Sequence, residues 1–264
     1  MNLCIPHLCT RTSGTDPIGQ LAERVRVRGA ARNPDTDRCI MDDSEIPPCD
    51  PSGAEGCALT ARDPPAYQAA LLTVLAARSL LRPSAVTVAV IGSGAAVALQ
   101  LFLIARYVPG VSHIAVCQPD AEPDRWVVDA LELAGIGLAR TNHPGEAAFG
   151  ANLVVVCGAA DGHVGLADGA TGPQVHLPAG ALVVNATGRD LPSALIDQVT
   201  EVFVDDISLA SSATVGDPPR LGYARHRAES KYRPHGDLAG ILAGRRQGRI
   251  SEEHVLLVDL LSVG

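Results

Sequence analysis

The sequence contains few aromatic side chains and almost no lysine. Phe, Trp and Tyr together make up 3% of its 264 residues, and Lys231 is its single lysine. With so few rings, there is little material on which nucleic-acid bases could stack. The formal net charge of −8 also opposes binding to phosphate backbones. Nucleic acid is therefore not an expected partner, and any chemistry that needs a lysine amine depends on Lys231.

Cysteine is present, but not in the patterns of common metal sites. None of the seven cysteines forms a C-x-x-C pair. Five of them fall in the first quarter of the chain: Cys4, Cys9, Cys39, Cys49 and Cys57. The first residues lack the basic and apolar segments of a secretory signal, so we expect free thiols and a cytoplasmic protein. Zinc binding by Cys4, His7, Cys9 and a later cysteine is the alternative, but the spacing is not a standard one, and no metal is expected.

One long uncharged stretch is not interpreted as a membrane span. Residues 85–105 carry no charge and are numerous enough to cross a bilayer. The first half of this stretch is rich in β-branched residues, however, and its middle is Gly92-Ser93-Gly94. A strand, a glycine turn and a helix explain this pattern better than one lipid-spanning helix. No membrane partner is expected.

From residue 65 onward, the sequence alternates between strand and helix patterns, whereas residues 1–64 show little periodicity. A helix is predicted first, from apolar residues at helical spacing between Ala70 and Leu81. The predicted strands are 86–91, 112–117, 136–141, 152–157, 181–186 and 202–204, and the predicted helices are 95–107 and 124–133, with a helical turn at 146–149. This alternation predicts an α/β fold of Rossmann type, with a doubly wound parallel sheet.

The turn after the first of these strands has the residues of a phosphate-binding loop. Gly92, Ser93, Gly94 and Ala95 open the helix, where small residues let the backbone approach a pyrophosphate and free N–H groups attract its charge. The alternative is a tight turn without a ligand. Gln118 stands where an acidic residue would bind the ribose, so both NAD and NADP remain open as cofactors.

Several segments resemble the ornithine cyclodeaminase/mu-crystallin family, in its order and at about its spacing. They are residues 75–83, 90–94, 185–192, 202–206, 244–251 and 262–264. The resemblance implies an NAD(P)-dependent oxidoreductase that acts on an amino acid or an imine, which we place in bacterial specialised metabolism. A ring-closing cyclodeaminase that releases ammonia is one alternative. A degenerate protein that binds a dinucleotide or a partner without turnover is the other.

The resemblance also implies roles for individual residues. Asp190 would act as an acid or base beside the nicotinamide, although from its position it could equally cap a helix that begins near Pro192. Besides the glycine turn and Gln118, the residues expected near the cofactor are Cys157, Gly158, Ala159, Asn185, Ser262 and Val263.

Two departures from the family concern the substrate and the assembly. The arginine that grips the substrate carboxylate corresponds to Gln68, with Arg62 as a nearby substitute, and the family lysine has no counterpart. We interpret residues 1–64 as a reduced, irregular substrate and dimerisation region, and residues 65–264 as the dinucleotide-binding domain with a C-terminal return segment. A small amino acid or imine is the expected partner. A homodimer is also expected, because the apolar helix at residues 67–81 would otherwise be exposed.

Two polar clusters are given structural interpretations. His226, His235 and Asp237 lie in an arginine-rich segment that we expect to be a solvated loop rather than a site. Asp205 and Asp206 follow the last predicted strand, where a turn or helix cap is expected rather than a metal site.

Overall fold

The computed structural model describes residues 18–19, 21–23, 64–82, 86–118, 121–158, 175–189, 191–211 and 234–263. Its strands are β1 (Val86–Gly92), β2 (Val111–Cys117), β3 (Gly137–Thr141), β4 (Leu153–Cys157), β5 (Leu182–Ala186), β6 (Glu201–Val204), β7 (Gly236–Asp237) and β8 (Leu256–Asp259). Its helices are α3 (Pro64–Leu80), α4 (Ala95–Tyr107), α5 (Arg125–Leu133), α6 (Pro144–Ala148), α7 (Ser193–Ile196), α8 (Ile207–Ser211) and α10 (Leu238–Leu242). A short 3₁₀ helix at Leu261–Val263 is called the C-terminal turn below.

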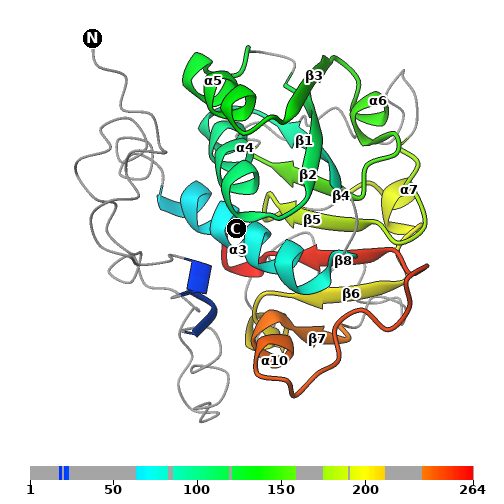
Figure 1. Ribbon diagram of the computed structural model, residues 1–264. Helices are drawn as coiled ribbons and strands as arrows, with labels where there is room; N and C mark the ends of the chain where they lie inside the picture. Colours follow the sequence, from blue (N-terminus) through cyan, green and yellow to red (C-terminus); the bar gives the residue numbers. More distant parts are fainter. Residues whose placement is uncertain are drawn as a thin grey trace.

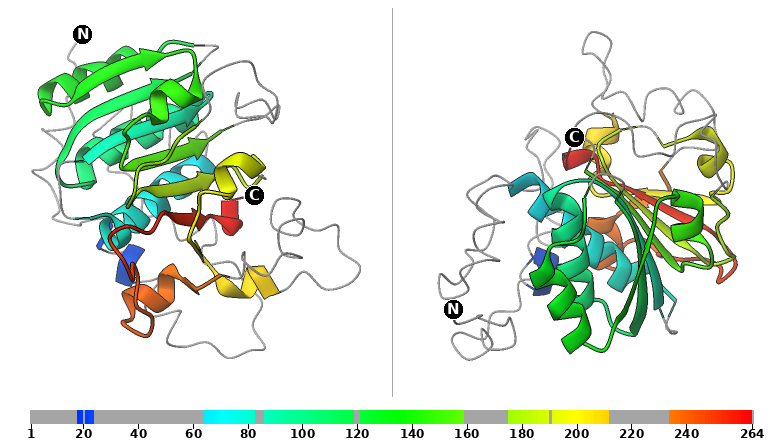
Figure 2. Two further views of the ribbon diagram at one scale, coloured as in Figure 1. Left: turned by 90° about the vertical axis from the view of Figure 1, so that its right-hand side faces the viewer. Right: turned by 90° about the horizontal axis from the view of Figure 1, so that it is seen from above.

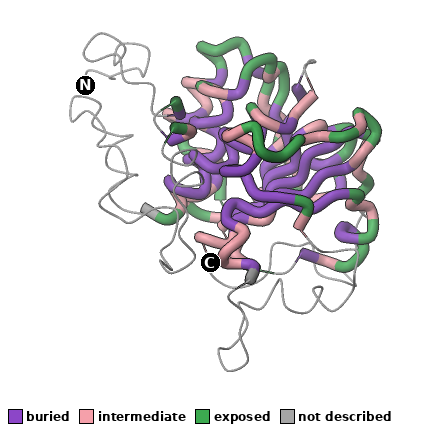
Figure 3. The backbone as a smooth tube through the Cα atoms, turned by 90° about the horizontal axis from the view of Figure 1, so that it is seen from below, coloured by how far each residue is buried: buried purple, intermediate pink, exposed green. Residues whose placement is uncertain are grey.

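The eight strands form one parallel sheet in the order β3-β2-β1-β4-β5-β8-β6-β7 (Figure 1). Helices α3, α4 and α5 share a core with one face of the sheet, and α6 and α7 share a core with the other face (Figure 2). Every residue of β4 and β5 is buried, as the continuous purple centre of the fold shows (Figure 3). The predicted α/β fold with a doubly wound parallel sheet is confirmed.

The far half of the sheet departs from the prediction, because β7 and β8 were not predicted. β8 returns from the C-terminal part of the chain and pairs with both β5 and β6. Its apolar run is only a few residues long, and periodicity does not assign so short a run to a strand. In the first half, where the patterns are longer, α4 has the predicted bounds and β1 extends one residue further, to Gly92.

Helix α3 lies inside the protein rather than on its surface. Each of residues 67–77 is at most 8% exposed, and α3 packs against α4, β5 and the C-terminal turn. Ile18 and Leu21 belong to the same core. The apolar helix that led us to expect a homodimer is therefore covered within one chain, so that argument for a dimer does not hold. Within the described ranges, no helix has the length and apolar character needed to span a bilayer.

A polar pair is buried between α3 and α4. Gln100 Nε2 donates to Thr73 Oγ1 at 3.2 Å, whereas Gln100 Oε1 has no hydrogen-bond partner. Both residues are at most 1% exposed. A buried polar atom without a partner destabilises the folded state, and apolar groups of similar shape avoid that cost.

We predict that the double substitution Thr73→Val and Gln100→Leu leaves the free energy of unfolding unchanged or raises it by about 1 kcal/mol. Thr73→Val alone should lower it, because Gln100 Nε2 then also loses its partner. Urea denaturation of both variants and the parent protein measures the difference. A double variant less stable than Thr73→Val would contradict the prediction.

Candidate functional site

The glycine turn joins β1 to α4 and passes close to the end of β4. A Cβ atom added to Gly92 would lie 2.0 Å from the carbonyl oxygen of Cys157, so only glycine allows this approach. Gly94 has φ 68° and ψ −159°, a conformation that is strained for any other residue. A Cβ atom on Gly94 would meet no atom within 4 Å, so this glycine faces open space.

Ser93 ties the glycine turn to the segment that follows β4. Its backbone N–H and its hydroxyl both donate to the carbonyl oxygen of Gly158, at 3.0 and 2.7 Å. Gly158 has a φ of 51°, and a Cβ atom there would lie 2.5 Å from the Ser93 carbonyl oxygen. Ser93 and Gly158 therefore hold the ends of β1 and β4 against each other and fix the shape of the turn.

The first turn of α4 has backbone N–H groups that are available to donate hydrogen bonds to a ligand. Among the described residues, nothing accepts a hydrogen bond from the backbone N–H of Ala95 or Ala96, and the N-cap residue Gly94 has no side chain to do so. No acidic residue lies in this first turn. Val97, which occupies the position of a third glycine, is 1% exposed and packs into the core. Free N–H groups and the helix dipole favour an anion at this point, so the turn is suited to a phosphate group.

Gln118 lies at the same edge of the sheet as the glycine turn. Ile91 of β1 pairs with Cys117 of β2, which brings Gln118 level with Gly92. The Gln118 residue is partly exposed. Its amide can therefore reach a ligand bound along this edge, with a hydrogen bond but without a charge.

Cys157 lies beneath the site rather than in it. It pairs with Gly92 and is 1% exposed. Burial raises the pKa of its thiol to about 12, so the thiol stays neutral and is a poor nucleophile. Contact between a ligand and this part of the chain would fall to Gly158.

Asn185 organises the loop that follows β5. Its Nδ2 donates to the carbonyl oxygen of Arg189 at 2.7 Å and to Asp259 Oδ1 at 2.9 Å. Its Oδ1 accepts hydrogen bonds from the backbone N–H and the hydroxyl of Thr187, at 3.2 and 2.7 Å. Asn185 is 2% exposed, so its amide shapes the loop and has no capacity left for a ligand.

The loop held by Asn185 leads directly to Asp190. Asp190 itself, Ala159 and Arg62 lie outside the described residues. Helix α7 begins at Ser193 with Pro192 at its N-cap position. Asp190 stands two positions before Pro192 in the sequence, and both of its suggested roles, acid or base and helix cap, stay predictions.

The structure brings Gln68 and Ser262 together, although they are far apart in the sequence. Gln68 Nε2 on α3 donates to Ser262 Oγ in the C-terminal turn at 3.4 Å. Gln68 is only 8% exposed, while Ser262 and Val263 are partly exposed. The neutral, largely buried Gln68 amide thus supports the C-terminal turn instead of presenting a charge.

Asp205 and Asp206 both act on the backbone. Asp206 Oδ1 accepts hydrogen bonds from the N–H and the hydroxyl of Ser208, and thereby caps α8, as predicted. Asp205 is fully buried, and its carboxylate accepts hydrogen bonds from the N–H groups of Leu261 (2.8 Å) and Ser262 (3.0 Å). The sequence suggested a turn or cap at this pair, but not this long-range contact.

The structure corrects the predicted solvated histidine loop at Asp237, whereas His235 is exposed as expected. Asp237 is 7% exposed and caps α10 by accepting a hydrogen bond from the N–H of Gly240 at 2.7 Å. His235 Nδ1 accepts from the N–H of Val202 at 3.3 Å, and His226 lies outside the described residues. Nowhere in the described part of the chain do three or more potential metal ligands gather.

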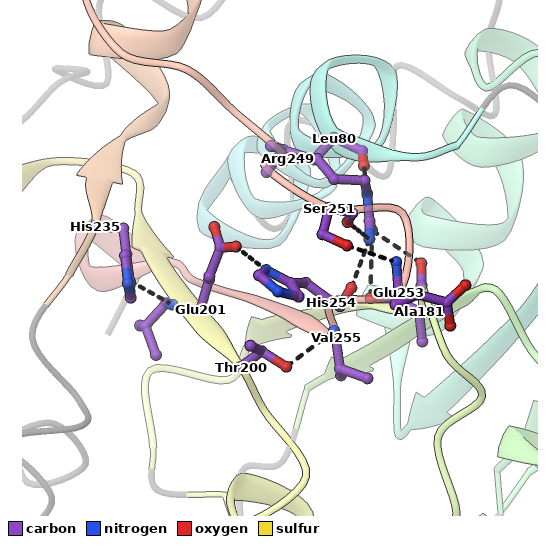
Figure 4. A network of polar contacts seen from close by, with 12 residues as sticks. Leu80, Ala181, Thr200, Glu201, His235, Arg249, Ser251, Glu253, His254 and Val255 are labelled. Atoms are coloured by element: carbon purple, nitrogen blue, oxygen red, sulfur yellow. Dashed lines mark hydrogen bonds and ion pairs between the residues drawn. The ribbon is translucent and has the colours of Figure 1, made fainter.

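A second polar network lies at the opposite edge of the sheet, where β5, β6 and β8 begin (Figure 4). Arg249 donates to the carbonyl oxygens of Leu80 and Gly180, both at 2.9 Å, and to that of His254 at 2.5 Å. The His254 ring nitrogen Nδ1 is also hydrogen-bonded to the carboxyl group of the buried Glu201. Burial lowers the pKa of the Arg249 guanidinium. Arg249 clamps α3 to the strands, a structural role for a residue in one of the segments that carry the family resemblance.

Comparison with known proteins shows which family this sequence is similar to. The family model of the ornithine cyclodeaminase/mu-crystallin family matches residues 60–264. Ornithine cyclodeaminase of Agrobacterium tumefaciens (strain Ach5) is 27% identical over 202 residues, which cover 75% of this chain and 52% of that protein. The chain thus spans about half the length of this curated relative.

Two solved structures have a similar fold. The Δ1-pyrroline-2-carboxylate reductase of Thermococcus litoralis, in complex with NADH and L-proline, is 17% identical with a TM-score of 0.57, covering 79% of this chain and 62% of that one. The iminosuccinate reductase of Paracoccus denitrificans, in complex with NAD⁺, is 19% identical with a TM-score of 0.56, covering 79% and 61%. The family model covers most of the sequence, and the protein belongs to the ornithine cyclodeaminase/mu-crystallin family.

Proposed function

We propose that this protein is an NAD(P)-dependent oxidoreductase that acts on the C–N bond of an amino acid or an imine. The observation that carries the proposal is the glycine turn, where the N–H groups of Ala95 and Ala96 have no acceptor among the described residues and Gly94 faces open space. Relatives with a similar fold include two reductases in complex with NADH or NAD⁺.

The residues present fit a dinucleotide. Its pyrophosphate would lie over Gly92–Gly94 at the start of α4, with Gln118 toward one ribose and Gly158 and the C-terminal turn toward the other. The open space at Gly94 and the absence of an acid in the first turn of α4 support this fit. When bound, NAD(P) would supply or accept a hydride at the carbon of the C–N bond. The neutral Gln118 leaves the choice between NAD and NADP open.

Asp190 is the proposed acid or base. It directly follows the loop whose backbone Asn185 and Thr187 fix by hydrogen bonds. A carboxylate held there would donate or accept the proton of the substrate nitrogen and stabilise positive charge on it. Gln68 and Arg62 are the proposed substrate contacts, with Gln68 limited to hydrogen bonding through its neutral amide.

A ring-closing cyclodeaminase is the second candidate, favoured by the similarity to ornithine cyclodeaminase over 75% of this chain. The same cofactor and the same carboxylate would serve it. Product analysis separates the candidates, because only the cyclodeaminase releases ammonia without a net change in NAD(P)H. A cytoplasmic location and a homodimer stay predictions.

We predict that NAD(H) or NADP(H) raises the melting temperature of the protein, and that Gly94→Leu abolishes this shift. A ligand at a hundred times its Kd stabilises a protein by about 2.7 kcal/mol, which is readily measured. In Gly94→Leu the side chain occupies the space proposed for the pyrophosphate.

Gly135→Leu is the matched control for this experiment. Gly135 also has a positive φ, 70° against 68° at Gly94, and it also faces open space, but it lies after α5. Both variants should lose stability through backbone strain, and only Gly94→Leu should lose the cofactor shift. Absence of any shift in the natural protein with all four dinucleotides would refute the proposal.

We further predict that Asp190→Asn lowers turnover by about 10²-fold, in the range of a general acid–base group. Melting temperature and cofactor shift should stay nearly unchanged, because the amide keeps the size of the side chain. The assay follows NAD(P)H absorbance with a panel of amino acids and cyclic imines. Asp197→Asn, at the end of α7 and seven positions further along the sequence, also removes a carboxylate charge and should keep turnover. Loss of stability in Asp190→Asn with unchanged turnover per folded molecule would show a structural role instead.

A further inference from the structure

Asp205 is a fully buried carboxylate whose partners come mainly from a distant part of the chain. Oδ1 accepts hydrogen bonds from the N–H of Leu261 at 2.8 Å and of Asp206 at 2.9 Å. Oδ2 accepts from the N–H of Ser262 at 3.0 Å. The C-terminal turn therefore provides most of the donors that satisfy this carboxylate.

The burial of Asp205 makes these hydrogen bonds hard to replace. Its relative exposure is 0%, and no Arg, Lys or His among the described residues is bonded to it. Removal from water raises the pKa of Asp205, while the hydrogen bonds from Ser262 and Leu261 act in the opposite direction. A buried carboxylate that lost these donors would be strongly destabilised, so the position of the turn is tightly specified.

The same turn touches both neighbours of the proposed cofactor site. On one side, Ser262 Oγ accepts a hydrogen bond from Gln68 of α3. On the other side, Leu260, the residue directly before the turn, donates its N–H to the carbonyl oxygen of Asn185, the residue that shapes the loop before Asp190. The backbone N–H of Asp205 also donates to the carbonyl oxygen of Asp259 at 3.3 Å. Asp205 thus lies where the ends of β6 and β8, the C-terminal turn and α3 are joined.

We propose that Asp205 is a positioning residue, which sets the C-terminal turn so that Ser262 and Val263 meet the bound dinucleotide, and which couples cofactor binding to α3 through Ser262 and Gln68. The proposal rests on the proposed function, since it assumes a dinucleotide at the glycine turn. Asp205 does not touch the cofactor in this scheme. Its effect passes through the backbone of residues 261 and 262.

The neighbouring Asp206 provides a matched comparison. It is as deeply buried, at 1% exposure, and its Oδ1 accepts hydrogen bonds from the N–H and the hydroxyl of Ser208 at the start of α8. Asp206→Asn should disturb the cap of α8 but, unlike Asp205→Asn, it keeps both carboxylate oxygens that accept from the N–H groups of Leu261 and Ser262. A difference between the two aspartates therefore separates positioning of the turn from a general loss of stability.

The experiment compares Asp205→Asn, Asp206→Asn and Ser262→Ala in the full chain. An asparagine at 205 has one acceptor oxygen and places an NH₂ group against an N–H donor, so amide hydrogen exchange at residues 261 and 262 should accelerate about tenfold or more. The Kd for NAD(H) or NADP(H), measured by thermal shift or calorimetry, should rise about tenfold. Asp206→Asn should leave both quantities at the parent values.

Ser262→Ala should raise the Kd, and adding it to Asp205→Asn should raise the Kd less than the two separate effects combined.

The outcomes distinguish this proposal from the proposed function. If the parent protein binds no dinucleotide, the proposed function fails. If the parent binds and Asp205→Asn binds equally well although amides 261 and 262 exchange faster, the positioning role is refuted. Should Asp205→Asn not fold, Ser262→Ala alone decides, because it keeps the Asp205 carboxylate and its backbone bonds. An unchanged Kd in Ser262→Ala would then overturn the proposal.

Discussion

The pairing of β8 between β5 and β6 joins the two halves of the sheet. Among the described strands, β6 pairs only with β7 and β8, so without β8 the last strands would have no backbone hydrogen bonds to the rest. Leu256 and Val258 are fully buried against one core and Leu257 against the other. The burial of these few side chains drives a long return of the chain across the sheet. That return also delivers the C-terminal turn to the edge where β1, β4 and β5 end.

Hydrogen bonds between residues that are far apart in the sequence fix the positions of the loops around the site. The sequence alone does not reveal such pairs, which limits what it can predict. β1, α4 and the glycine turn follow from local periodicity and from glycine chemistry, and they were predicted with nearly correct bounds. Asn185 and Asp259 are 74 positions apart, and Asp205 and Ser262 are 57 apart. No local pattern identifies such partners. The family resemblance suggested Asn185 as a residue near the cofactor, and the structure adds that its side-chain amide is fully hydrogen-bonded within the protein. The hydrogen bonds that join Asp205 to the C-terminal turn were not predicted.

The start of α4 and the ends of β6 and β8, which flank the proposed site, differ in whether their backbone N–H groups already have an acceptor. At the start of α4, the N–H groups of Ala95 and Ala96 have no acceptor in the part of the chain that the structure describes, so this flank attracts an anion. At the ends of β6 and β8, backbone N–H groups are directed to the buried carboxylate of Asp205, so this flank is already satisfied. Under the proposed function, an extended ligand would carry its negative charge at the first flank. It would meet the second flank through neutral contacts with Ser262 and Val263.

The replacement of an arginine by Gln68 bears on the kind of substrate the proposed enzyme could hold. A hydrogen bond between neutral groups contributes about 0.5–1.5 kcal/mol, against about 1.5–3 kcal/mol when one partner is charged. Gln68 is also 8% exposed and already bonded to Ser262, so releasing its amide for a carboxylate would cost that bond. Within the described residues, α3 thus contributes to ordering the C-terminal turn more than to gripping an anion. Selectivity in such a site would depend on the nitrogen of the substrate and on Asp190, because Gln68 places no positive charge where the family arginine would recognise a carboxylate.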